Sequence, residues 1–142
     1  MTNDECKKII QKLFSEIDFE KHLDDKQLWV NGKSYRIKPD DAYYFLNQTI
    51  YLIEYEYNKC PVESISKFWW LFKETDIFDQ VSKIKLLLIT TNEKTGEIRN
   101  RSIEILGEEL EDQYPDKFEF YFIPDDLVTS NVIARTVGNM FE

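Results

Sequence analysis

Histidine and cysteine, the residues that build most compact metal and nucleophile sites, are nearly missing from this sequence. It has one histidine, His22, and two cysteines, Cys6 and Cys60, which stand far apart without partners at metal-ligand spacing. This scarcity argues against zinc sites of the usual His/Cys kind and against histidine-based catalytic triads. Two distant cysteines are instead typical of reduced thiols in a cytosolic protein.

Glycine, proline and long apolar runs are also scarce. Four glycines and four prolines in 142 residues argue against a loop-rich or fibrous protein. No apolar run approaches the roughly 20 residues of a membrane span, and residues 1–5 lack the basic and apolar regions of a signal peptide. We therefore expect a cytoplasmic protein without membrane contact, folded as a single domain over residues 1–142.

Positive charge is in short supply as well. The chain carries 18 Lys and Arg against 27 Asp and Glu, a net charge of −9, which argues against nucleic-acid binding over most of its surface. The imbalance is uneven: residues 1–60 hold 9 basic and 11 acidic residues, whereas residues 61–142 hold 9 and 16. A site for an anionic partner is therefore expected in the first, nearly neutral part.

Hydrophobic periodicity and turn residues predict alternating helices and strands. The expected helices are 3–18, with a capping box formed by Thr2 and Glu5, a second helix that begins at Pro61, and 101–114. Residues 19–26 are predicted to be a polar connection, and 92–100 a polar loop. The expected strands are an Asn31-Gly32 hairpin over 28–38, a second hairpin of 42–46 and 50–57, an apolar strand at 86–91, and 118–123.

These elements follow the order α-β-β-β-α-β-α-β, with the hairpins forming a three-stranded antiparallel meander. Crossovers through helices favour parallel placement of the late strands. The predicted fold class is therefore α/β, or α+β, with a central mixed sheet flanked by helices.

The segment from Pro39 to Lys67 carries the residues that indicate function. Glu54 and Glu56 lie two apart in a strand that is apolar on both faces, so the two carboxylates share one face and are expected to be buried. Buried carboxylates need a partner, and a Mg²⁺ ion suits converging carboxylate oxygens.

The cross-strand register decides which aspartate joins these glutamates. If residues 47–49 form a three-residue loop, Ala42 opposes Glu54 and Asp40 opposes Glu56, which clusters Asp40 with both glutamates. A two-residue loop would bring Asp41 to the Glu54 side instead. Sequence leaves both registers open.

Pro39-Asp40 followed by Glu54-Tyr55-Glu56 resembles the motif of the PD-(D/E)XK nuclease superfamily, with glutamate in place of the usual lysine. The α-β-β-β-α-β core of that family would cover residues 3–91, with the aspartate opening the second strand and the D/E-X-K in the third. The resemblance implies a restriction-endonuclease-like fold and a metal-dependent endonuclease acting on DNA, working as a homodimer or as a subunit of a larger nuclease system.

Metal-assisted phosphodiester hydrolysis assigns a role to each candidate residue. Asp40 and Glu54 are expected to bind Mg²⁺ or Mn²⁺, with the backbone carbonyl of Tyr55 as a third ligand. Glu56 would bind metal or orient the attacking water. Lys67, in the following helix, would stabilise charge on the phosphate, or it is simply a solvated lysine.

Ordinary structural explanations stand beside these assignments. Glu54 and Glu56 also fit the charges that protect an edge strand from aggregation. Lys33, Arg36 and Lys38 are either a phosphate-binding face or ordinary surface. The acidic second half, together with the missing motif lysine, supports a different function: a non-catalytic acidic interaction or inhibitor protein, of the immunity or DNA-mimic type.

Overall fold

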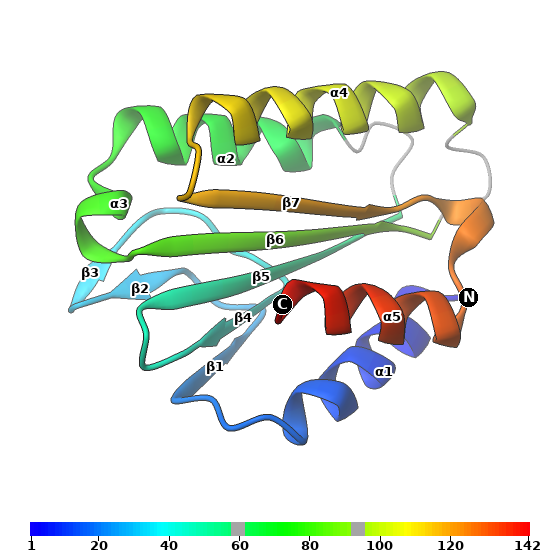
Figure 1. Cartoon of the computed structure of the whole chain (residues 1–142), viewed down its shortest axis with the longest axis horizontal. Coiled ribbons are helices and arrows are strands. Elements are labelled where there is room, and N and C mark those ends of the chain that lie inside the picture. The colour runs from blue at the N-terminus through cyan, green and yellow to red at the C-terminus, as the bar shows by residue number, and fades with distance from the viewer. Residues whose placement is uncertain (58–61, 92–95) are drawn as a thin grey trace.

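A computed structural model describes residues 1–57, 62–91 and 96–142. The chain forms a five-stranded sheet with helices on both faces, and a small two-stranded sheet lies beside it (Figure 1). The helices are α1 (Asn3–Ser15), α2 (Val62–Glu74), α3 (Ile77–Gln80), α4 (Glu97–Gln113) and α5 (Ser130–Met140), with a 3-10 turn η1 (Asp125–Leu127). The strands are β1 (Lys21–Asp24), β2 (Trp29–Val30), β3 (Lys33–Ser34), β4 (Asp41–Tyr44), β5 (Thr49–Glu56), β6 (Lys83–Thr90) and β7 (Phe118–Ile123).

The main sheet has the strand order β1-β4-β5-β6-β7. The β1–β4 and β4–β5 pairs are antiparallel, whereas β5–β6 and β6–β7 are parallel. The predicted mixed sheet with parallel late strands is therefore confirmed. The two parallel connections run through α2 with α3 and through α4, because a crossover between parallel strands needs a dozen or more residues.

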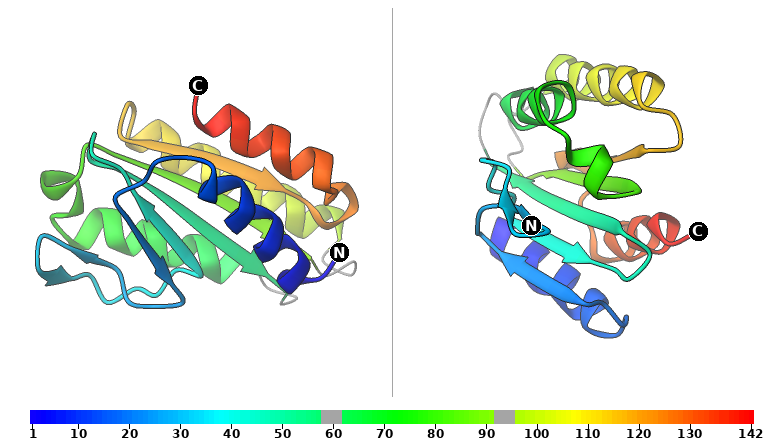
Figure 2. Two further views of the ribbon diagram at one scale, coloured as in Figure 1. Left: turned by 90° about the horizontal axis from the view of Figure 1, so that it is seen from below. Right: turned by 90° about the vertical axis from the view of Figure 1, so that its left-hand side faces the viewer.

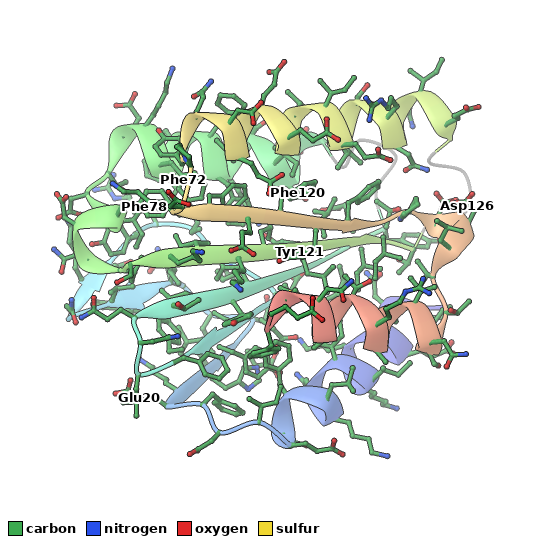
Figure 3. The ribbon with its side chains drawn as sticks, in the orientation of Figure 1. Glu20, Phe72, Phe78, Phe120, Tyr121 and Asp126 are labelled. Carbon is green, nitrogen blue, oxygen red and sulfur yellow. The ribbon has the colours of Figure 1, made fainter. Side chains whose placement is uncertain are left out.

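Two hydrophobic layers hold the helices to the sheet. α2 and α4 cover one face, and α1 and α5 cover the other (Figure 2). Side chains alternate between these layers along each strand: in β7, Phe120 points toward α4, whereas its neighbour Tyr121 belongs to the layer of α1 and α5 (Figure 3). Strand β5 is buried on both faces from Thr49 to Tyr55, as its apolar sequence predicts.

Several element boundaries match the sequence-based expectation. Thr2 and Glu5 form the predicted capping box of α1, and β7 spans the predicted residues. Helix α4 begins at Glu97, four residues earlier than expected, so 97–100 are helical rather than part of a loop. The predicted helix start at Pro61 and the second cysteine, Cys60, lie outside the described residues.

The predicted meander is wrong in one strand. The Asn31-Gly32 hairpin does form, with φ of 53° and 79° at its two turn residues, but β2 and β3 pair only with each other. The first strand of the main sheet is β1, from the segment that we expected to be a polar connection. An edge strand with no buried position and a single aliphatic side chain, Leu23, lacks the alternation that identifies a strand in sequence.

Among the described residues, no helix combines the length and the apolar character that crossing a membrane requires.

Candidate functional site

The β4–β5 hairpin sets the position of every candidate carboxylate. Its loop has three residues, one of the two lengths that sequence left open, and these are 46–48. The Phe45 N–H donates to the Thr49 carbonyl at 3.1 Å, and Gln48 has a φ of 63°. A three-residue loop that ends in a left-handed residue is a common hairpin connection. The predicted loop, 47–49, is therefore wrong by one position.

That displacement moves the cross-strand pairs by two residues and leaves the faces unchanged. Ala42 pairs with Leu52, not Glu54, and Asp41 pairs with Ile53. Continued by one residue, this register places Asp40 opposite Glu54 rather than Glu56. Because the shift is even, Asp40 still shares a face with Glu54, as the three-residue loop predicted.

Asp40 and Glu54 are bound to each other's strands at the end of the ladder. The Asp40 N–H donates to Glu54 Oε2 at 3.2 Å, and the Tyr55 N–H donates to Asp40 Oδ2 at 2.7 Å. The ladder ends here because Pro39, the next residue toward Tyr55 in this register, has no N–H to donate. Because Pro39 has no N–H, the Tyr55 carbonyl lacks the hydrogen bond that any other residue at position 39 would donate to it.

Lys67 of α2 forms an ion pair with Glu54 Oε1. The Glu54 side chain is 4% exposed and that of Lys67 is 30% exposed, so the pair lies at the border between the core and solvent. Sequence named both residues but gave no means of knowing that they touch. The packing of α2 across β5 brings them together.

Burial raises the pKa of Glu54 to about 8. Lys67 opposes this rise because its positive charge favours the ionised carboxylate, whereas the nearby Asp40 carboxylate adds to it. Glu54 therefore holds its proton at a pH where an ordinary glutamate is ionised. Perturbed carboxylates of this kind are frequent at functional sites.

Glu56 does not join the Asp40–Glu54 pair. Its Oε2 accepts a hydrogen bond from the Ser64 hydroxyl in the first turn of α2, where the helix dipole favours negative charge. The expected cluster of three carboxylates is therefore not formed. Across residues 1–57, 62–91 and 96–142, no group of three or more His, Cys, Asp or Glu side chains is arranged to hold a metal ion.

Asp41 lies on the opposite face of the sheet and is fully buried. It accepts hydrogen bonds from His22 Nε2 at 2.7 Å, from the Tyr55 hydroxyl at 2.9 Å and from Gln11 at 3.2 Å. These contacts tie helix α1 and the edge strand β1 to β4 and β5, so Asp41 has a structural role. The alternative register, with Asp41 beside Glu54, is wrong.

Two hydroxyl residues near the carboxylates were not singled out from sequence. Ser64 binds Glu56, and Thr90 pairs with Glu56 in the β5–β6 register. The buried Thr90 hydroxyl has no hydrogen-bond partner among the described residues. Its position at the end of an apolar strand was the available signal, since carboxyl ends of parallel strands commonly carry site residues.

The geometry thus unites Asp40, Glu54 and Lys67 and separates them from Glu56 and Asp41. Two oxygen ligands and an ammonium group beside a partly exposed edge are able to bind a hard cation or a phosphate. No protein-family model, curated protein or solved structure matches this chain.

Proposed function

We propose that this protein is a Mg²⁺- or Mn²⁺-dependent endonuclease that hydrolyses phosphodiester bonds in DNA. The observation that carries the proposal is the Asp40–Glu54 carboxylate pair with Lys67 against it. Asp40 and Glu54 supply two hard oxygen ligands, and the pKa of Glu54 is raised. Lys67 supplies a cation suited to a phosphate oxygen.

The ligand set fits a magnesium ion. Mg²⁺ in phosphoryl-transfer sites is commonly bound by only one or two carboxylates and completes its shell with water and substrate phosphate. Asp40 and Glu54 would supply the carboxylates, and the Tyr55 carbonyl would supply a third oxygen. When bound, the ion would lower the pKa of a water molecule and neutralise charge at the phosphate.

The protein's own residues would orient the carboxylates and supply the charges that the reaction needs. Asp40 is fixed by the Tyr55 N–H, and Glu54 is fixed by the Asp40 N–H, so neither carboxylate swings freely. Lys67 would move from Glu54 toward a phosphate oxygen once a metal ion balances the glutamate. Glu56, which accepts a hydrogen bond from Ser64, would accept a proton from the attacking water without binding the metal itself.

The order of elements supports a restriction-endonuclease-like fold. Within the main sheet, α1 is followed by β1, β4 and β5, then by α2 and β6, which is the α-β-β-β-α-β order of the PD-(D/E)XK resemblance. Asp40 directly precedes the second strand of this series, and Glu54 and Glu56 lie in the third. A domain of this size would act on two DNA strands as a homodimer or as one subunit of a larger assembly.

Cleavage of plasmid and branched DNA in Mg²⁺ or Mn²⁺ tests the proposal. We expect activity in the wild type and its loss in Asp40→Asn and Glu54→Gln, which keep the shape of each side chain while removing its charge. Asp126→Asn is a matched control. The tripeptide Pro-Asp-Asp occurs at 39–41 and again at 124–126, and Asp126 ends the second copy and is exposed (Figure 3). Cleavage that survives both site substitutions would refute the assignment.

A non-catalytic interaction protein is the second candidate. It is favoured by the exposed acidic side chains of α4, among them Glu108, Glu109 and Asp112, and by the engagement of Glu56 with Ser64 in place of a free catalytic group. A wild-type protein that is folded yet cleaves no DNA substrate with either metal would favour this function over the nuclease.

A further inference from the structure

One segment of this acidic chain is purely basic. Residues 26–38 contain Lys26, Lys33, Arg36 and Lys38 and no Asp or Glu, although the whole chain has a net charge of −9. We call residues 26–38 the basic arm. It contains β2 and β3 and continues toward the start of β4 at the edge of the molecule (Figure 2).

The basic arm is anchored by one side and presents its cations on the other. Its buried apolar side chains belong to the core beneath α2: they are Leu28, Val30, Tyr35 and Ile37. The side chains of Lys33, Arg36 and Lys38 alternate with them and are exposed. At its ends, the Asp25 N–H donates to the Asp40 carbonyl at 2.8 Å. The cations are therefore carried by a fixed element.

Few contacts within the protein occupy these charges. Lys33 lies 3.0 Å from Asp76 and Lys38 lies 3.7 Å from Asp25, but both are exposed pairs of the kind that contributes about 0–1 kcal/mol. Within the described part of the chain, the Arg36 side chain makes no hydrogen bond or ion pair. The cations are thus available to an anionic partner at little cost.

Arg36 also has a strained backbone. Its φ is 60°, a left-handed conformation that asparagine or glycine adopts more readily than arginine. A strained residue with an unpaired guanidinium indicates that the side chain, and not the local fold, accounts for arginine at this position.

The basic arm leads directly to the candidate site. Lys38 is two residues from Asp40 and Arg36 is four, so their Cα atoms lie within about 7 Å and about 14 Å of that of Asp40. At the far end, Lys33 and Arg36 border a groove that Trp70, which is 42% exposed, and the acidic residues Glu74 and Asp76 also line. Exposed cations in the segment that leads into Asp40 suit a phosphate backbone that passes over the site.

We propose that the basic arm binds the phosphate backbone of DNA and directs it toward Asp40 and Glu54. Arg36 and Lys38 make the phosphate contacts, and Lys33 extends them along the groove. Charge complementarity identifies the partner, because Lys33, Arg36 and Lys38 are exposed and closely spaced, and the ion pairs of the two lysines are weak enough for a polyanion to replace. The choice of DNA as that polyanion rests on the proposed nuclease function.

Binding is measured without metal, so that cleavage does not interfere. The probe is a fluorescein-labelled 20-base-pair duplex in EDTA, followed by fluorescence anisotropy over a range of salt concentrations. The test variant is Arg36→Asn with Lys38→Gln, since asparagine tolerates the positive φ and the fold is kept. Arg135→Gln, an exposed arginine on α5, is the control.

The double variant is expected to bind roughly tenfold more weakly, with a salt slope smaller by about 1.8, or about 0.9 for each lost phosphate contact. Arg135→Gln is expected to bind like the wild type. Trp29 lies in the basic arm, and the other two tryptophans lie in α2. Duplex DNA should therefore also change the intrinsic fluorescence of the protein.

An unchanged affinity and salt slope in the double variant would overturn the proposal, as would a wild type that does not bind the duplex. The cleavage assay keeps this result separate from the proposed function. A wild type that binds through the arm but never cleaves refutes only the nuclease. Cleavage by the double variant at wild-type affinity refutes only the arm.

Discussion

The Asp40 N–H donates to Glu54 Oε2 at 3.2 Å, and this bond joins two strands where their regular ladder ends. It holds one carboxylate against the backbone of the residue that carries the other. The arrangement places two carboxyl groups together beside Lys67 in a mostly buried site.

The stability of the wild type is expected to fall as pH rises from 4.5 to 8. The folded protein holds the Glu54 proton up to a pKa of about 8, whereas the unfolded chain releases it near 4.5. The folded state therefore binds more protons in this window, and unfolding becomes easier by up to about 1.4 kcal/mol per pH unit. Urea unfolding of the wild type and Glu54→Gln across pH 5–9 isolates the effect, which the variant should lack.

Opposite shifts in the pKa of Glu54 are expected from its two charged neighbours. Lys67→Met should raise this pKa further, because it removes the positive charge that favours the ionised form. Asp40→Asn should lower it, because it removes a negative charge; each change should be roughly one unit or more. An NMR titration of the Glu54 side-chain carbonyl measures both. Shifts in the same direction would contradict the arrangement of the three groups.

Metal binding should stabilise the protein more at high pH. A divalent cation needs the ionised Glu54, so it must displace a proton below pH 8. Saturating Mg²⁺ or Mn²⁺ is expected to raise the Tm by a few degrees at pH 9 and by less at pH 6. Asp40→Asn and Glu54→Gln should lose this gain. A Tm increase that persists in both variants would place the cation elsewhere.

Adjacent aspartates should behave differently when replaced by alanine. Asp41→Ala removes a buried acceptor of three hydrogen bonds and leaves the Tyr55 hydroxyl without a partner, which should cost about 3 kcal/mol of unfolding free energy. Asp40→Ala, at a half-buried position, should cost less and act mainly on metal binding and cleavage. Chemical denaturation compares the two. Equal losses of stability would argue against their separate environments.

Two glycines in helices should respond to alanine with opposite signs. A Cβ atom at Gly107 of α4 would lie 2.0 Å from the Phe120 ring, whereas one at Gly138 of α5 would meet nothing within 4 Å. Gly107→Ala should therefore destabilise the protein by about 1–3 kcal/mol through overpacking. Gly138→Ala should stabilise it by about 0.5–1 kcal/mol through helix propensity. Thermal unfolding measures both, and a tolerated Gly107→Ala would show that α4 is able to move away from β7.

Local sequence determined the elements whose signals are strong. The capping box of α1, the Asn31-Gly32 turn and the apolar strands β5, β6 and β7 follow from periodicity and turn chemistry. The faces of β5 were also predictable, because side chains alternate strictly along a strand. Asp40 and Glu54 could therefore be assigned to one face by a three-residue loop before the exact pairs were known.

Only the tertiary structure decided how these elements meet. The loop at 46–48 set Asp40 opposite Glu54, and the docking of α2 brought Lys67 to the same carboxylate. The tertiary structure also placed β1 in the main sheet and left the β2–β3 hairpin outside it. These outcomes depend on contacts between residues distant in the chain, and the periodicity of a single segment carries no information about its partner.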